Sequence, residues 1–526
     1  MNKKKLGILA FGGIVCVAAA VGYAKYGWRG MQGANSLHLD LAHPDALIVT
    51  SSLATLPRDL LTIPLAHDVL REDFLFYYEQ NEDRLGLKGT LRRIAYEHEL
   101  GWGDQLIQMV LDEPAEVALW RDADGSLKHF AISVTRNKLT QLLEESAKIA
   151  LKDSQMTVAG SLKVSGDKVP VYALAYAHKR TLLFAAHGTR LVILSNPGMV
   201  YGGKDGTSAD SKAADVVVRM LGEDAKQQSF RQQFQLEAQA GAGHSVAVKA
   251  DFLSFSYQPF FGALDALRFD FSKGHWSTRA LIDAAHLKPG GYDNRALWPA
   301  LPHNPAACFA LPADWTAMQP VLKNLDAGLA PLAEQLAGPA AVCWYGSSRL
   351  YTPLMVATRK PGAASDELLA KLYAASVGGA KSGEIKKTAG KNGEQLWQRT
   401  VATPIGETHP TLATSGQVVL FSPDAALVEQ ALAVAHKKAP AIADRLSDSS
   451  TTVGLISPSA LSDLIRKEAF DALPKDGEPV LRAAADVHLV PRLDALKKYP
   501  PYRLVLKTLP TSGVAWQPVE WQALEH

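Results

Sequence analysis

The fold is decided by a stretch that occurs twice, as PAEVALWRDADGSLKHFAISVTRNKLTQLLEESAKIA from Pro114 and as PAAVCWYGSSRLYTPLMVATRKPGAASDELLAKLYAAS from Pro339. Each copy contains two apolar runs separated by a short polar segment, and a pattern typical of a helix follows them. Thr135-Arg136 and Thr358-Arg359 fall at the same point, between the second run and the helix. We therefore expect a repeated strand–strand–helix unit.

Further parallels occur in the same order along the chain, which favours a divergent internal duplication. They are HPDALIVTSSLATLP and NPAACFALPADW, GSLKVSGDKVPVY and GEIKKTAGKNGEQLW, AAHGTRLVILSN and ATSGQVVLFSP, HSVAVKADFLSF and STTVGLISPSAL, and two closing runs near Trp276 and Trp516.

Local patterns within the copies indicate the class of fold. VYALAYA, LVILSN and SVAVKA alternate as half-buried strands do. The DADG sequence at Asp122–Gly125 predicts a hairpin turn, and Asn137 and Ser365-Asp366 are expected to start helices. We predict an α+β protein with two tandem, divergent copies of a mainly antiparallel sheet with packed helices. The first domain is expected at residues 40–290 and the second at residues 298–526.

The first copy carries an insertion at residues 67–102 that the second copy lacks. An insertion in one copy of a duplicated scaffold is where a copy-specific role is most easily added. The residues that we predict to bind a partner are therefore aromatic and arginine side chains of this insertion, although core packing is an alternative role for the aromatic ones. They are Phe76, Tyr77, Tyr78, Arg84, Arg92 and Arg93.

The N-terminus predicts a membrane segment. Residues 1–5 form a basic region, and residues 6–24 carry no charge and span roughly 28 Å as a helix, close to the thickness of a bilayer core. The run is long for a cleaved signal peptide, so we favour a retained transmembrane signal anchor, followed by a juxtamembrane linker at residues 25–39. The lysines before the run place the rest of the chain outside, and we expect a single-pass inner-membrane protein with its soluble region in the periplasm.

Composition excludes some classes of function. The chain has 526 residues and a formal net charge of +2, from 55 basic and 53 acidic residues. No long Lys/Arg run follows the first five residues, which argues against nucleic-acid binding. Three cysteines are too few for a disulfide scaffold. Cys308 and Cys343 lie in apolar, strand-like runs; two buried free thiols are the favoured interpretation, and a disulfide in an oxidising compartment stays open.

The sequence shows no strong catalytic or metal-binding motif. Glu97 and His98 lie in an acidic stretch without the HExxH spacing of zinc proteases, which favours a solvated helix face. DADG lacks the distal ligands of a calcium loop, and the HLDLAH sequence at His38–His43 would need further ligands to hold a metal. We therefore predict no catalytic residue, no metal site and no cofactor.

The stretches LPRDLL, DFLFYYEQNEDRLGLKGTLRRIAYEHEL and VALWR, between Leu56 and Arg121, resemble a bacterial family catalogued as domain of unknown function 2138. The resemblance extends through the second copy. It implies a single-pass protein that faces the periplasm, with an α2-macroglobulin-like protease trap as a possible partner, and it supplies no catalytic residues.

Three hypotheses about function follow. The leading one is a non-enzymatic, membrane-anchored scaffold that binds another envelope protein. The first alternative is an envelope hydrolase with a site assembled from distant residues, for example around Glu97 and His98. The second is a carrier of an apolar ligand, which would need a large apolar cavity, expected between the two copies.

Overall fold

The computed structural model describes the chain from residue 37 to residue 524 with several gaps. The residues not described within that range are 38, 54, 71–112, 123–124, 126, 136–155, 177–179, 202–210, 223–229, 237–242, 254–261, 288–292, 363–365, 378–381, 391–392, 404–405, 447–450 and 473–478.

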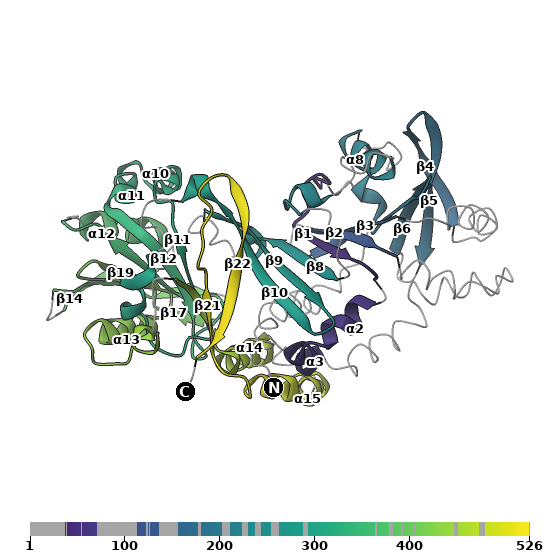
Figure 1. The fold of residues 1–526 in the computed structure, drawn as a ribbon. Coiled ribbons are helices and arrows are strands. Elements are labelled where there is room, and N and C mark those ends of the chain that lie inside the picture. The colour runs from purple at the N-terminus through teal and green to yellow at the C-terminus, as the bar shows by residue number, and fades with distance from the viewer. Residues whose placement is uncertain are drawn as a thin grey trace. The chain divides into compact units, whose positions relative to one another are not determined.

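The described residues pack into two compact units. The first unit contains the chain up to Lys249 together with Arg268–Trp276, and the second unit contains Ala250–Leu267 and everything from Ser277 onward. Both units are built mainly on antiparallel strands (Figure 1).

The sheet of the first unit has the strand order β8–β1–β2–β3–β7–β6–β5–β4, and every neighbouring pair is antiparallel. Its strands are β1 (Ala46–Thr50), β2 (Ala115–Arg121), β3 (Leu127–Thr135), β4 (Met156–Val164), β5 (Asp167–Tyr176), β6 (Arg180–His187), β7 (Arg190–Leu194) and β8 (His244–Lys249). Its described helices are α2 (Thr55–Leu61), α3 (Pro64–Leu70) and α8 (Ser211–Leu221).

The predicted turn at DADG joins β2 to β3. The backbone N–H of Gly125 donates to the carbonyl of Asp122 at 2.8 Å, and Gly125 has a φ of +81°, a conformation that glycine adopts without the steric penalty of a side chain. This prediction is confirmed.

The sheet of the second unit has the strand order β14–β15–β18–β19–β13–β12–β11–β20–β21–β22–β10, again antiparallel throughout. Its strands are β10 (His275–Asp283, in this unit from Ser277), β11 (Ala307–Pro312), β12 (Leu336–Trp344), β13 (Leu354–Arg359), β14 (Lys386–Ala389), β15 (Gln395–Gln398), β18 (Thr411–Ser415), β19 (Val418–Ser422), β20 (Thr452–Ile456), β21 (Tyr502–Val505) and β22 (Val514–Ala523). A small ribbon of β16 (Val401–Thr403) and β17 (Gly406–Thr408) is separate, and β9 (Leu264–Ser272) contributes residues to both units.

Helices cover both faces of the second unit's sheet. The helices of this unit are α9 (Ala250–Leu253), α10 (Gln319–Leu325), α11 (Leu332–Gln335), α12 (Asp366–Ser376), α13 (Ala425–Ala435), α14 (Pro458–Ala472), α15 (Pro479–His488) and α16 (Val490–Leu496). The start of α12 at Asp366 agrees with the helix predicted after Ser365-Asp366.

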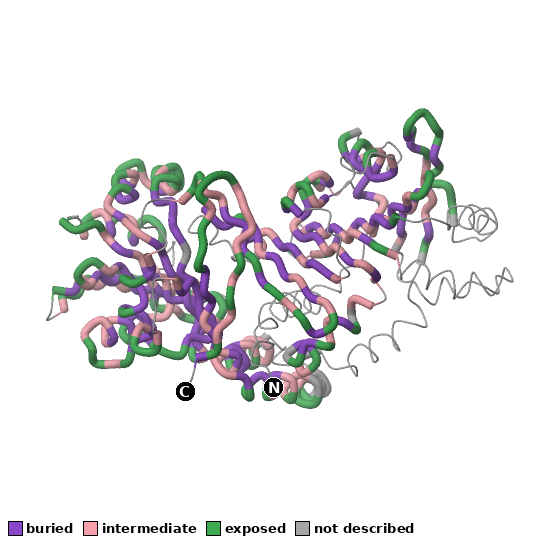
Figure 2. Tube along the Cα trace, viewed as in Figure 1, coloured by how far each residue is buried: buried purple, intermediate pink, exposed green. Residues whose placement is uncertain are grey.

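The two faces of this sheet have separate cores. One core joins alternate strand residues such as Val356, Ala413 and Leu420 to Leu427 and Ala431 of α13. The other joins the opposite side of the same strands to α10, α11 and α12. Figure 2 shows this burial along the strands, with exposed and intermediate residues on the covering helices.

Cys308 and Cys343 are directly opposite each other on β11 and β12 and form a disulfide. The interpretation as two free thiols was therefore wrong, because the antiparallel register places both side chains at the same position of neighbouring strands. Both residues are fully buried.

The mainly antiparallel sheet with packed helices agrees with the predicted α+β class. No helix in the described part of the chain is long and apolar enough to cross a membrane, and the predicted segment at residues 6–24 lies outside that part.

Candidate functional site

A cavity of about 260 Å³ lies inside the second unit, between one face of the sheet and helices α10 and α12. Its lining is almost entirely aliphatic and aromatic. The described lining residues are Trp315, Met318, Val321, Leu322, Leu325, Leu332, Leu336, Ala340, Ala341, Val342, Met355, Val356, Ala357, Leu369, Leu372, Tyr373, Ser376, Leu412, Val419 and Phe421.

Helical periodicity explains which side chains of the two helices reach the cavity. Next to and along α10, the lining residues are Met318, Val321, Leu322 and Leu325, with the spacing of one helix face. Along α12, the residues Leu369, Leu372, Tyr373 and Ser376 have the same spacing. Two amphipathic helices thus direct their apolar faces to the same space.

The floor of the cavity is the sheet, where alanine side chains occur on β12 and β13. Ala340 of β12 and Ala357 of β13 both line the cavity. Ala357 is only partly buried although β13 is an interior strand, and Met355 and Phe421, paired across β13 and β19, are also partly buried. This pattern is consistent with residues that border an open space, because close-packed neighbours would cover them.

The polar groups of the described lining are engaged within the protein. The Ser376 hydroxyl donates to the carbonyl of Leu372 at 2.6 Å, the Tyr373 hydroxyl donates to the carbonyl of Pro410 at 2.7 Å, and Trp315 Nε1 donates to the carbonyl of Gly338 at 2.9 Å. Burial raises the pKa of Tyr373 to about 12. A guest in this cavity would therefore meet an apolar surface, and the lining can recognise shape and apolar area but not a polar group.

The apolar lining continues to the surface at α10. Val321 is 44% exposed and Leu325 is 46% exposed, although both line the cavity. Large aliphatic side chains in such a position mark the mouth of the cavity.

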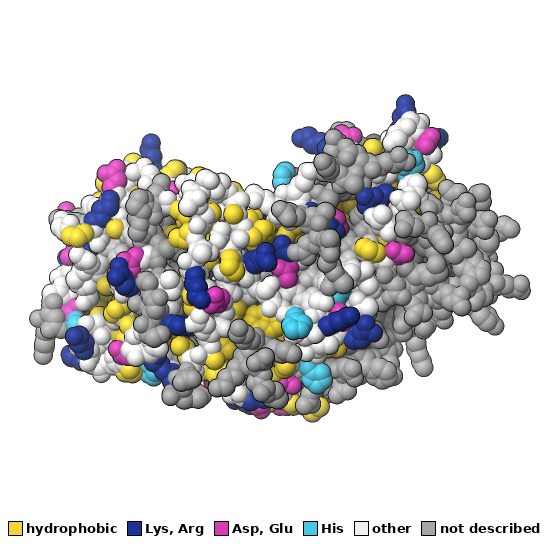
Figure 3. Space-filling model, in the orientation of Figure 1, with side chains coloured by type: hydrophobic (Ala, Val, Ile, Leu, Met, Phe, Trp, Pro, Cys, Tyr) yellow, Lys and Arg dark blue, Asp and Glu magenta, His cyan; other side chains and the backbone are white. Residues whose placement is uncertain are grey.

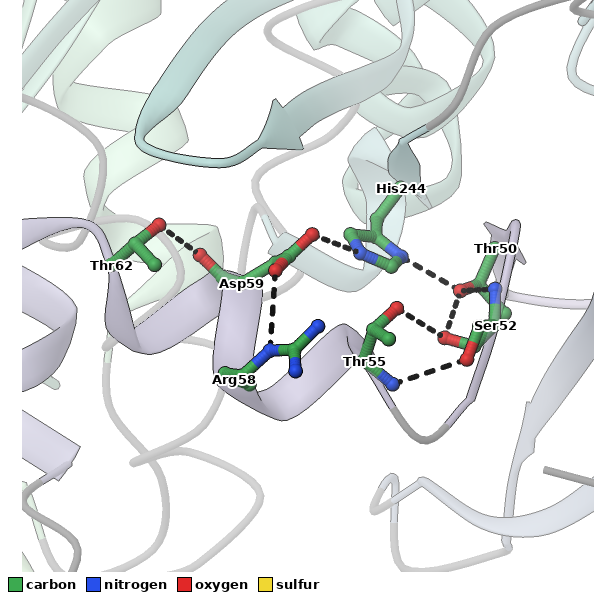
Figure 4. Close-up of polar contacts among 7 residues, drawn as sticks. All are labelled: Thr50, Ser52, Thr55, Arg58, Asp59, Thr62 and His244. Atoms are coloured by element: carbon green, nitrogen blue, oxygen red, sulfur yellow. Dashed lines mark hydrogen bonds and ion pairs between the residues drawn. The ribbon is translucent and has the colours of Figure 1, made fainter. Parts of the chain in front are cut away.

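A second feature is a buried polar cluster in the first unit (Figure 4). His244, the first residue of β8, has Nδ1 2.7 Å from the Thr50 hydroxyl and Nε2 3.2 Å from the Asp59 carboxylate. Thr50 ends β1 and Asp59 lies on α2, so the imidazole joins three elements.

The hydroxyl–imidazole–carboxylate order of this cluster is that of a hydrolase triad, but its geometry is not that of a nucleophile. The Thr50 hydroxyl donates to the carbonyl of Ser52 at 2.7 Å and accepts from the N–H of Ser52. Thr50 is 2% exposed and His244 is 3% exposed, so a substrate could not reach them without local opening. The cluster satisfies buried polar groups and fixes α2 against the sheet.

The other candidate site residues from the sequence either form an ordinary surface ion pair or lie outside the described residues. His43 Nδ1 is 2.6 Å from the Asp40 carboxylate in an exposed pair, and no group of three possible metal ligands occurs within the described ranges. Glu97, His98 and the predicted partner-binding residues all lie outside those ranges. The latter are Phe76, Tyr77, Tyr78, Arg84, Arg92 and Arg93.

The face of the molecule drawn in Figure 3 has no large patch of only positive or only negative side chains among the described residues. Figure 3 shows Lys and Arg side chains interspersed with Asp and Glu. An open depression of about 470 Å³ at α14 and α15 follows the same pattern, since Asp463 and Asp486 line it together with Arg466, Lys467 and Arg482.

A family model described as an uncharacterized protein conserved in bacteria, DUF2138, matches residues 7–525. The chain belongs to this family. This chain is also 33% identical over 554 residues to the uncharacterized protein YfaA of Escherichia coli K12, and the match covers 98% of each protein. The resemblance seen between Leu56 and Arg121 therefore extends along the whole chain.

The similarity to solved structures is slight. Two crystal forms of TP0453 match with 11% and 10% identity and a TM-score of 0.22, over 48% of this chain and 82% of the other. A match at this level supports no inference about fold or activity.

The carrier hypothesis expected an apolar cavity between the two copies, and the sequence predicted neither the cavity within the second unit nor the His244 cluster. The spacing of Met318, Val321, Leu322 and Leu325 was a signal for an apolar helix face, but it does not tell whether that face packs tightly. His244 had no local signal, since its partners lie 194 and 185 residues away.

Proposed function

We propose that this protein is a non-enzymatic binding module that holds an apolar ligand in the cavity of its second unit. The observation that carries the proposal is a cavity of about 260 Å³ with an apolar lining that reaches the surface at Val321 and Leu325. Native interiors are packed with few voids larger than a water molecule, and a void lined by apolar groups stays dry or takes an apolar guest.

The expected affinity follows from the apolar area that a guest would bury. Each buried methylene contributes roughly 0.8 kcal/mol, so a chain of about eight methylenes would gain roughly 6 kcal/mol, which corresponds to a dissociation constant of tens of micromolar. Such a guest would cover apolar side chains that otherwise border empty space or water.

Photo-crosslinking of the full chain in lipid nanodiscs tests this proposal. An uncharged alkyl-diazirine alcohol should label peptides that contain α10 or α12, Gln319–Leu325 and Asp366–Ser376. Ala357→Leu, which adds side-chain atoms at the cavity floor, should reduce this labelling to background. Labelling that is absent in the wild type, or unchanged in a folded Ala357→Leu variant, would refute the proposal.

The proposal places this module outside the inner membrane, tethered by residues 6–24. The uncharged run after Lys3, Lys4 and Lys5 supports this placement. The Cys308–Cys343 disulfide also supports it, because disulfides persist in oxidising compartments such as the periplasm. A protease-protection assay on intact spheroplasts, with antibodies to each end of the chain, tests this placement. Protection of the C-terminal end would contradict it.

We also attribute the two units to a divergent duplication. The support is the common strand order: counted along the sheets, β8–β1–β2–β3–β7–β6–β5–β4 in the first unit corresponds to β20–β11–β12–β13–β19–β18–β15–β14 in the second. The ordered sequence parallels support the same origin.

A partner-binding role for the insertion at residues 67–102 is the second candidate function. Its support is that only the first copy has the insertion, which is rich in aromatic and arginine residues. The partner would be another envelope protein, and the family resemblance suggests an α2-macroglobulin-like protease trap. Affinity purification from membranes with and without residues 71–102 tests it, and equal recovery of the same partner by both folded proteins would refute it.

A further inference from the structure

An ion pair joins the two helices that border the cavity. The Lys371 ammonium on α12 lies 2.8 Å from the carboxylate of Asp326, the residue that ends α10. Lys371 is adjacent in sequence to Leu372, and Asp326 is adjacent to Leu325, and both leucines line the cavity. The pair therefore stands beside the mouth that Leu325 and Val321 mark.

The cavity cannot hold a polar group of a ligand inside it. The hydroxyls of Ser376 and Tyr373 already donate to backbone carbonyls, and the rest of the described lining is apolar apart from the engaged Trp315 Nε1. A buried polar group without a partner costs free energy. If the cavity holds a ligand with a polar end, as this inference assumes by building on the proposed function, that end must remain at the mouth.

Asp326 and Lys371 differ in how many further hydrogen bonds each can make. Asp326 Oδ1 accepts from the backbone N–H of Gly328 at 2.7 Å as well as from Lys371, and so caps the turn at Ala327–Leu329. The hydrogen bond from Lys371 is the main cause that holds the pKa of Asp326 below its usual range. An ammonium has three donors, and the Asp326 carboxylate takes one, so Lys371 can bind a second acceptor.

The place of the ammonium also depends on a glycine. A Cβ added to Gly328 would overlap Lys371 Nζ, so the missing side chain leaves room for the ammonium group. Gly328 does not have a positive φ, which means that Gly328→Ala would displace the ammonium without straining the backbone.

We infer that the ligand is a single-chain amphiphile with an anionic head, whose chain fills the cavity and whose head binds Lys371. A carboxylate and a phosphate monoester share the chemistry that an ammonium recognises. The charge of the cavity mouth thus selects among apolar molecules of similar length.

The test compares three photoactivatable probes with the same twelve-carbon chain, a carboxylate, a phosphate monoester and an alcohol, on the full chain in phosphatidylcholine nanodiscs. In the wild type, the carboxylate or the phosphate should label α10 and α12 peptides more than the alcohol does. Lys371→Met and Gly328→Ala should each reduce labelling by the preferred anion by about threefold, which is what an exposed charge pair contributes. Labelling by the alcohol should not change, and Lys371→Arg should retain the preference.

Lys323→Met is the matched control, because Lys323 is an exposed lysine of α10 that does not line the cavity. It removes the same charge and should leave the ratio of anion to alcohol unchanged. Equal labelling of the wild type by all three probes, with no effect of Lys371→Met or Gly328→Ala, would overturn the head-group inference and leave the cavity proposal standing. If no probe labels α10 or α12, the proposed function itself fails.

Discussion

A pair of identical substitutions on opposite faces of one sheet tests whether the cavity is an open space. Ala357 of β13 lines the cavity and is partly buried, whereas Ala413 of β18 is fully buried in the core against α13. Leucine adds three carbon atoms at either position. At Ala357 these atoms can enter the cavity, whereas at Ala413 they must displace packed neighbours.

The two variants should therefore differ in the sign of their effect on stability. At about 0.8 kcal/mol per buried carbon, Ala357→Leu should be neutral or raise the free energy of unfolding by up to about 2 kcal/mol. Overpacking should lower it by about 1–3 kcal/mol in Ala413→Leu. In a domain of this size, 1 kcal/mol shifts the melting temperature by roughly 2–4 °C, so thermal melts of both full-length variants can resolve the difference. If Ala357→Leu melts as low as Ala413→Leu, the space is not available and the reasoning about the cavity is wrong.

Three further predictions concern the rest of the fold. His244→Ala should lower the free energy of unfolding by about 3 kcal/mol, because it removes the imidazole that contacts both the buried Asp59 carboxylate and the Thr50 hydroxyl. Arg58→Ala, at a side chain that is 74% exposed and 3.9 Å from Asp59, should change the urea midpoint by little, and equal effects of the two variants would contradict the role assigned to His244. Burial raises the pKa of Tyr373 in the folded state to about 12, so the contribution of its neutral phenol to stability should be complete below pH 10 and be lost as the pH rises toward 12. In urea titrations from pH 9 to pH 11, the free energy of unfolding should fall less in Tyr373→Phe than in the wild type, and an identical fall would argue against burial of the phenol. Gly454→Ala should destabilise the second unit by about 1–3 kcal/mol, since its Cβ would lie 3.1 Å from the Cys308 carbonyl and 3.0 Å from the Phe309 ring; an unchanged melting temperature would mean that β11 and β20 can separate at little cost.

Local patterns predicted the local elements of this protein well. The alternating runs around Val117 and Val192 form strands, DADG forms a turn, and α12 begins at Asp366, because each depends on residues close in sequence. The pairing of Cys308 with Cys343 depends on the register between two strands, which neither run encodes by itself.

The candidate site depends on tertiary distances, so the sequence could not reveal it. The apolar face of α10 has the same periodicity whether it packs tightly on a sheet or stands away from it. Only the position of α10 relative to Ala340 and Ala357 distinguishes a filled core from a cavity. Similarly, His244 meets Thr50 and Asp59 only after β8 has paired with β1.

The pairing of β10 with β22 limits how this chain can be divided. Thr278–Asp283 pair with Val514–Val519, so the last strand of the second unit forms its backbone hydrogen bonds with a segment more than 200 residues earlier in the sequence. A fragment that begins at residue 298 would lack that segment and expose the backbone edge of β22. The unpaired N–H and C=O groups of that edge could then pair with other chains, which promotes aggregation. Recombination or gene fission between the two predicted domains, at residues 291–297, would separate β22 from the same segment, so the two halves of the gene are expected to be inherited together.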